Sequence, residues 1–268
     1  MNRIQLKFEV LKEKGKTALV PYITAGDPKP WVTVPLMHGM VDAGADILEI
    51  GVPFSDPMAD GPTIQAACER ALEHNISLSN VLEMVTEFRK KDTDTPVVLM
   101  GYLNPVEVMG YQDFATRASA AGVDGLLTVD MPPEEAQDLL QALGSVDLAP
   151  IFLLSPTSSE ARTRLISECG KGFLYYVSLK GVTGVKSLDI DAVSSKLESI
   201  RSVSDLPVGV GFGIKDAETA AQVAGVADAV VVGSAIVQRM AQYKDKPDQI
   251  INAVPLFIRE LRTAIDKV

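Results

Sequence analysis

A row of short apolar runs constrains the fold of this chain more than any other feature of its sequence. Eight runs of four to six residues occupy positions 18–23, 47–50, 96–100, 125–129, 150–154, 173–177, 207–210 and 229–232. They are mostly apolar along their whole length, which is typical of parallel strands that are buried on both faces. Their average spacing of about 30 residues is the size of a strand–helix–strand unit.

The stretches between these runs predict helices. Seven stretches are amphipathic and long enough to cross over between parallel strands, at residues 31–43, 78–90, 113–121, 133–143, 159–169, 191–203 and 216–224. Asp216 stands where a helix N-cap is expected, and Gly44, Gly122 and Gly170 fall where helices should stop. Residues 1–15 alternate charged and apolar side chains, which predicts an extra N-terminal helix.

Eight strand–helix units with no leftover half favour a closed (β/α)8 barrel, the TIM barrel. Such barrels form one domain of roughly 250 residues, and no Ser/Gly linker or block of charge divides this chain. We therefore expect a single TIM-barrel domain over residues 1–268. The alternative is a doubly wound open sheet, which usually has a glycine fingerprint after its first strand. Residues 24–28 read TAGDP at that place.

Composition excludes several classes of partner and site. The net charge of −10 argues against nucleic acid, because duplex binding needs a basic face. Cys68 and Cys169 are far apart, and His38 and His74 lack partners at metal spacing, so no metal site or disulfide is expected. No apolar run approaches the roughly 20 residues of a membrane helix, and the N-terminus lacks a signal peptide's apolar core. We expect a cytoplasmic protein without a membrane partner.

Two neighbouring loops of the predicted barrel suit a phosphate. Barrel active sites lie on the loops after the strands, and phosphate is often held after strands seven and eight. The seventh run leads into GVGFGI at residues 209–214, which includes Gly211, Phe212 and Gly213, and the eighth leads into Gly233 and Ser234 at the start of a helix. Glycines allow close backbone approach, and N–H groups at a helix start attract anions. Tight turns alone would explain any single glycine, but the two loops together favour phosphate binding.

A third glycine-bearing loop follows the sixth run. It contains Thr183 and Gly184 and continues to Asp191, a length that suggests a mobile lid.

Carboxylates gather at the same predicted face. Glu49 lies in the second run among branched apolar residues, where burial would raise its pKa and suit it to proton transfer. The alternative is an ion pair, but no basic residue lies nearby in sequence. Asp56 and Asp60 follow in a proline-rich loop, and either is suited to the chemistry or to capping a turn. Asp130 and Tyr175 also point to this face.

The segment around these carboxylates resembles a known family. Residues 48–65, LEIGVPFSDPMADGPTIQ, are nearly the signature of the tryptophan synthase alpha-subunit family. Further landmarks of this family follow in the same order over essentially the whole chain: Pro21 with Gly26-Asp27-Pro28, Asn104-Pro105, Asp130 with Pro132, Tyr175, residues 181–184, residues 211–213 and Gly233-Ser234. One departure is Leu179-Lys180, where many members have an arginine at the first position. The role of that cation in lid closure is therefore not carried over.

The resemblance implies a retro-aldol lyase that cleaves indole-3-glycerol phosphate to indole and glyceraldehyde 3-phosphate in tryptophan biosynthesis. It implies Glu49 as the acid–base group, Asp60 as the carboxylate facing the indole N–H, and the three glycine loops as the phosphate cradle. Tyr175, Thr183, Gly184, Gly211, Phe212, Gly213, Gly233 and Ser234 are the substrate-binding residues so implied.

The resemblance also implies a partner. No cofactor is expected in this chain, and pyridoxal phosphate is expected only in a beta subunit. The expected assembly is an alpha2-beta2 tetramer, in which the beta subunit docks on the loop of Pro53, Phe54 and Pro57 and on the Asn104-Pro105 turn.

Two rival functions stay open on the sequence. A Schiff-base aldolase would use Lys180, but a lysine among Gly and Ser lacks the apolar pocket that lowers its pKa. A non-catalytic barrel would bind a phosphorylated ligand and only activate a partner, and loss of either Glu49 or Asp60 would have favoured it.

Overall fold

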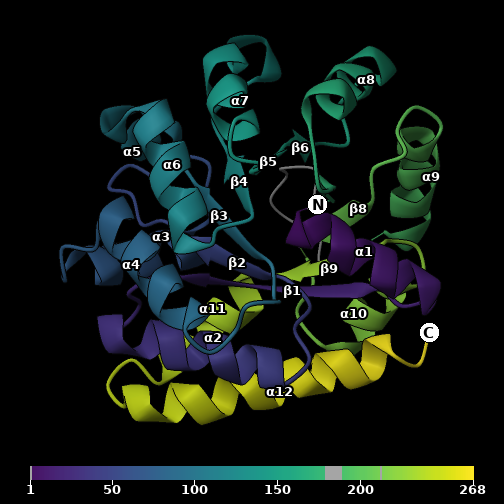
Figure 1. The fold of residues 1–268 in the computed structure, drawn as a ribbon. Coiled ribbons are helices and arrows are strands. Elements are labelled where there is room, and N and C mark those ends of the chain that lie inside the picture. Colours follow the sequence, from purple (N-terminus) through teal and green to yellow (C-terminus); the bar gives the residue numbers. More distant parts are fainter. Residues whose placement is uncertain (1, 179–188, 212) are drawn as a thin grey trace.

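The computed structural model describes residues 2–178, 189–211 and 213–268, and its strands form one parallel sheet (Figure 1). The strand order is β5-β4-β3-β2-β1-β9-β8-β7-β6. The strands are β1 Ala18–Thr24, β2 Leu48–Gly51, β3 Val97–Gly101, β4 Gly125–Thr128, β5 Ala149–Ile151, β6 Leu153–Leu154, β7 Leu174–Val177, β8 Val208–Gly211 and β9 Ala229–Val232. Each predicted strand is present at its predicted place.

One predicted strand differs in detail, because residues 150–154 form two short strands. β5 pairs with β4, and β6 pairs with β7. Only Phe152 separates β5 from β6, so the two ends of the sheet are joined by the chain itself. This junction closes the sheet into the predicted barrel.

Helices surround the strands (Figure 1). The seven predicted crossover helices are present as α2 Thr33–Asp42, α4 Leu78–Arg89, α6 Tyr111–Ala121, α7 Gln137–Gly144, α8 Glu160–Cys169, α9 Ile190–Arg201 and α10 Ala217–Ala224. A 3-10 turn, Pro133–Glu135, replaces the predicted start of α7. Asp216 caps α10 as predicted, since its side chain accepts from the Thr219 N–H at 2.9 Å.

Some helices go beyond the prediction. α11, Ser234–Gln242, was expected only from its first residues, whereas α3 Pro62–Leu72, α5 Leu103–Met109 and α12 Ile250–Ile265 were not predicted. α12 packs against α2 and α10, where Gly39 of α2 leaves room for Pro255. No helix in the described ranges is long and apolar enough to span a bilayer.

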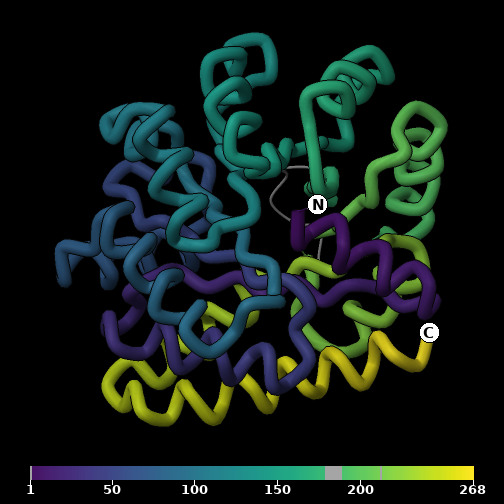
Figure 2. Tube along the Cα trace, viewed as in Figure 1, coloured from purple at the N-terminus to yellow at the C-terminus, as the bar shows by residue number. Residues whose placement is uncertain are grey.

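The N-terminal helix α1, Arg3–Glu13, covers one end of the barrel. Its buried residues Ile4, Phe8 and Leu11 belong to the same apolar cluster as the inward-facing strand residues, and the Phe8 and Phe173 rings lie 5.7 Å apart. Figure 2 shows this purple segment lying across strands from the C-terminal half of the chain. The opposite end, formed by the carboxyl ends of the strands, is the end at which the active sites of such barrels lie.

Three aspartates tie the strands together at the covered end. Asp46, Asp124 and Asp228 lie just before β2, β4 and β9. Each accepts the backbone N–H of a residue at the start of the neighbouring strand: Leu19 of β1, Val97 of β3 and Val208 of β8, respectively. Each also forms an ion pair with one or two arginines. Asp46 pairs with Arg262, Asp124 with Arg89 and Arg3, and Asp228 with Arg201. Such bonds between charged side chains and the backbone fix the strand register.

Candidate active site

Glu49 lies inside the barrel near the carboxyl ends of the strands. Ile47 belongs to the inner apolar cluster, and strand side chains alternate faces, so Glu49 projects inward one layer above it. The side chain is 1% exposed. Neither carboxylate oxygen has a hydrogen-bond partner among the residues that the structure describes. The ion pair considered as an alternative is therefore absent from that part of the chain.

This burial changes the protonation of Glu49. Loss of water raises its pKa to about 8, and the nearby charge of Asp60 adds to the rise. The carboxyl group is therefore mostly protonated at neutral pH, which lets it donate a proton and then accept one.

Asp60 lies in the loop between β2 and α3, on the way into the site. Its Oδ2 atom accepts the Tyr102 hydroxyl at 3.0 Å, and its carbonyl accepts from the Gln65 side chain at 2.8 Å. Burial raises the pKa of Asp60, and the Tyr102 hydrogen bond opposes the rise. Asp56 is exposed and accepts from the adjacent Ser55 hydroxyl. Of the two candidates, Asp60 is the one whose charge reaches Glu49.

Two tyrosines join Glu49 in the upper layer of the barrel interior. Tyr22 is the register partner of Glu49 on β1, and Tyr175 lies two residues beyond the inward-facing Phe173. Burial raises the pKa of both phenols well above the usual value, so both stay neutral. The sequence analysis predicted Tyr175 at this face and missed Tyr22, whose signal was its alternation with Val20 on β1.

Two strand-end glycines make room for these tyrosines. A Cβ atom at Gly51 would collide with the Tyr22 hydroxyl, and one at Gly211 would collide with the Tyr175 hydroxyl. Gly211 was predicted as part of a phosphate cradle, and its contact with Tyr175 is a feature that sequence reasoning missed.

The start of α11 has the geometry of an anion site. Gly233 is its N-cap and supplies no side chain, whereas the N-cap of α10 is occupied by the Asp216 carboxylate. The first N–H groups of a helix lack intrahelical partners and carry partial positive charge. A Cβ atom at Gly233 would meet nothing closer than Tyr22, at 3.6 Å, so the space beside the backbone is open toward the site.

The other predicted cradle residues are divided between described and undescribed parts of the chain. Gly213 has a φ of 80°, a conformation that favours glycine. Phe212, Thr183, Gly184 and Lys180 lie outside the described residues. Next to them, Ser178 donates its N–H and its hydroxyl to the Gly211 carbonyl, at 3.1 and 2.9 Å, which joins the ends of β7 and β8.

Asp130 and Tyr102 also lie at this face and form hydrogen bonds. Asp130 is exposed, and its carboxylate accepts the Leu103 N–H at 2.8 Å, so it caps the start of α5. Tyr102, which the sequence analysis did not single out, is 4% exposed and contacts Asp60, Ala59 and Phe54.

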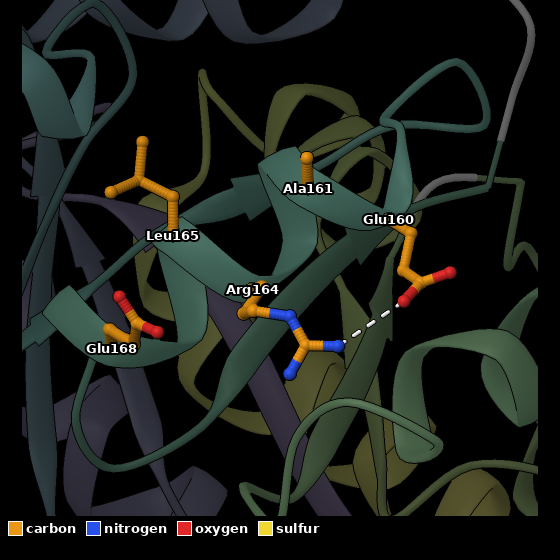
Figure 3. A pocket seen from close by; sticks show the side chains of 5 residues that line it. All are labelled: Glu160, Ala161, Arg164, Leu165 and Glu168. Carbon is orange, nitrogen blue, oxygen red and sulfur yellow. Dashed lines mark hydrogen bonds and ion pairs between the residues drawn. The ribbon is translucent and has the colours of Figure 1, made fainter.

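One surface hollow shares no residue with this site. It has a volume of about 480 Å³ and is lined by five residues of α8 alone. Figure 3 shows these residues, with an ion pair between Glu160 and Arg164 one turn apart. In the described ranges, no group of three or more His, Cys, Asp or Glu side chains is arranged to hold a metal.

Comparisons with known proteins agree over the whole chain. A family model described as Tryptophan synthase alpha chain matches residues 8–266. The tryptophan synthase alpha chain of Thioalkalivibrio sulfidiphilus is 62% identical over 99% of this chain and 100% of its own length. That of Nitrosococcus oceani is 62% identical over 99% of this chain and 98% of its own.

Solved structures agree as well. A crystal structure of tryptophan synthase subunit alpha from Legionella pneumophila has a TM-score of 0.94 at 47% identity, covering 100% of both chains. Tryptophan synthase from Mycobacterium tuberculosis, in an aminoacrylate-bound form, has a TM-score of 0.88 at 34% identity, covering 99% of this chain and 100% of that chain. The predicted TIM barrel is thereby confirmed, and the chain belongs to the tryptophan synthase alpha chain family, the lyases that cleave indole-3-glycerol phosphate in tryptophan biosynthesis.

Proposed function

We propose that Glu49 and Asp60 carry out the chemistry of this cleavage. The reaction adds a proton to C3 of the indole ring, breaks the bond from C3 to the side chain, and removes the proton of the adjacent hydroxyl to leave an aldehyde. The observation that carries the proposal is the buried Glu49 carboxyl group, which has no partner among the described residues and a pKa of about 8. Protonated Glu49 gives its proton to C3, and the resulting carboxylate takes the hydroxyl proton.

Asp60 supports this step electrostatically. Protonation of C3 places positive charge on the ring nitrogen, and a fixed carboxylate beside the N–H stabilises it. The Tyr102 hydroxyl donates to one oxygen of Asp60 and favours its ionised form. Burial raises the pKa of Asp60, and this hydrogen bond opposes the rise. On this proposal, Glu49 begins the reaction protonated and Asp60 acts as a carboxylate.

The phosphate lies, on this proposal, at the start of α11. The uncapped N–H groups after Gly233, together with Ser234, Gly213 and Gly211, support this placement. Tyr175 is proposed to line the indole side of the site, since its ring is 5% exposed beside Glu49. Phe212, Thr183 and Gly184 are proposed as binding residues on the family resemblance alone.

An alpha chain of tryptophan synthase works with a beta-chain partner. We propose an alpha2-beta2 tetramer in which the beta chain holds pyridoxal phosphate and this chain holds no cofactor. The proposed docking surface is the loop of Pro53, Phe54 and Pro57, together with the Asn104-Pro105 turn. Met58 lies in the same loop and is 80% exposed. Apolar side chains exposed to this extent at the mouth of a site suit a protein partner.

We further propose that residues 1–268 form one domain and act in the cytoplasm. The packing of α1 into the inner apolar cluster supports a role for the N-terminal segment in the fold.

The test is release of indole from indole-3-glycerol phosphate by the purified chain, alone and with a tryptophan synthase beta chain. Cleavage that Glu49→Gln removes supports the proposal, whereas borohydride trapping of substrate on Lys180 would favour a Schiff-base aldolase. Absence of cleavage, with ligand binding and activation of the partner retained, would favour the non-catalytic barrel.

A further inference from the structure

We propose that Tyr102 is a positioning residue that holds the Asp60 carboxylate in place for the reaction and links it to Phe54 on the partner-facing loop. This inference rests on the proposed function of Asp60. Tyr102 acts through Asp60 and not on the substrate.

The first support is the hydrogen bonding of the Tyr102 hydroxyl. The hydroxyl donates to Asp60 Oδ2 at 3.0 Å and accepts the Ala59 N–H at 2.9 Å. One phenol therefore holds both the side chain of Asp60 and the backbone just before it. Because the Ala59 N–H occupies an acceptor site of the phenol, the hydroxyl proton is directed at the carboxylate.

The second support is that Asp60 has few other restraints. Within the described ranges, Tyr102 is the only side chain that donates to the Asp60 carboxylate, and no Lys or Arg forms an ion pair with it. Gln65 binds the Asp60 carbonyl and leaves the carboxylate untouched. Removing the phenol hydroxyl would leave the catalytic carboxylate free to rotate.

The third support is the rigidity of Tyr102 itself. It directly follows β3, is the N-cap residue of α5, and is 4% exposed. The α5 start is tied to the β4 side of the barrel by the bond from the Leu103 N–H to Asp130. Tyr102 is therefore fixed by its attachment to β3 and β4, and it restrains the loop between β2 and α3 that contains Asp60.

The ring of Tyr102 also contacts the proposed docking surface. The Phe54 ring stacks on it, with the ring centroids 5.2 Å apart and the planes 29° apart. A partner that contacts Phe54 would therefore also affect the position of Tyr102, which binds Asp60.

The experiment is Tyr102→Phe, which removes the hydroxyl and retains the stacked ring. Loss of a hydrogen bond to a charged group is expected to lower kcat by about 10- to 100-fold, with a much smaller change in KM. The bond lowers the pKa of Asp60, so its loss should also move the acid limb of kcat/KM to higher pH. Tyr111→Phe is the matched control, because Tyr111 lies on α6 and its hydroxyl makes no hydrogen bond to the described residues.

A double-mutant cycle with Asp60→Asn separates positioning from general damage to the fold. If Tyr102 acts through Asp60, Tyr102→Phe changes kcat by less than about twofold in the Asp60→Asn background. Equal losses in both backgrounds, a parent-like kcat and pH profile, or a fall in the unfolding midpoint that accounts for the lost activity would each overturn the proposal. A parent protein that releases no indole would instead overturn the proposed function.

Discussion

The buried carboxylates at the two ends of the barrel differ in whether they have hydrogen-bond partners. At the end covered by α1, Asp124 accepts from two arginines and from the Val97 N–H, with distances of 2.8 to 2.9 Å. At the other end, Glu49 is just as buried, yet neither of its oxygens has a partner among the described residues.

The difference follows from what each charge does. A carboxylate that binds arginines and a backbone N–H fixes the strands against one another, so it contributes to stability. An unpaired one takes up a proton instead, because a bare charge in a low-dielectric interior is costly. The barrel therefore holds its strands together at one end and keeps a reactive proton at the other.

The largest effect that tests this comparison is on turnover. Glu49→Gln should lower kcat by about 10²–10⁴-fold, the usual contribution of a general acid–base group. Binding of indole propanol phosphate, which lacks the hydroxyl next to the ring, should stay near the parental value, because the start of α11 is untouched. Steady-state indole release and ligand titration measure the two. A variant with more than about a tenth of the parental kcat would remove Glu49 from the proton-transfer role.

At the covered end, the expected effect is on stability. Asp124→Ala should lower the free energy of unfolding by about 3–5 kcal/mol, because Arg89 is left buried without its main partner. The matched variant is Asp228→Ala, whose side chain is 40% exposed against 3% for Asp124, so its loss should be clearly smaller. Chemical denaturation gives both values. Equal losses would mean that burial of the pair does not set its contribution.

Stability should depend on pH through Glu49. Its folded pKa of about 8 is above the usual value of 4.5, so between these pH values the unfolded chain has lost a proton that the folded chain retains. The resulting contribution is fully present below pH 4.5 and is lost as the pH rises toward 8, by up to about 1.4 kcal/mol per pH unit. Denaturation at several pH values measures the slope.

The Glu49→Gln variant, which does not titrate, is the control for this slope. The slope of the parent minus that of the variant isolates Glu49 from the other groups. Identical slopes would show that Glu49 ionises normally in the folded protein.

The smallest expected effect is on KM and tests where the phosphate binds at the open end of the barrel. Gly233→Asp should raise KM by about tenfold or more, because the added carboxylate would face the phosphate at the start of α11. Gly225→Asp makes the same change where α10 ends, beside Val268, and should leave KM unchanged. An unchanged KM in both variants would place the phosphate elsewhere.

Local patterns in the sequence were sufficient for most of the architecture. Eight apolar runs predicted the barrel, and Asp216 predicted the cap of α10, because burial and capping depend on residues that are close in sequence. Glu49 stood out for the same reason, since a carboxylate among branched apolar residues is conspicuous in a short window. α12 was missed because it is not followed by a strand, so no strand–helix pattern marks it.

Contacts between distant residues were decided only by the tertiary structure. Tyr102 and Asp60 are 42 residues apart, and nothing in either local sequence indicates that their side chains meet. The same holds for Gly211 and Tyr175, and for the division of residues 150–154 between two neighbouring strands. The sequence by itself determined which residues lie in the strands, because an apolar run of four to six residues is a local feature. Which of them touch depends on strand register and barrel closure, and these are properties of the whole chain.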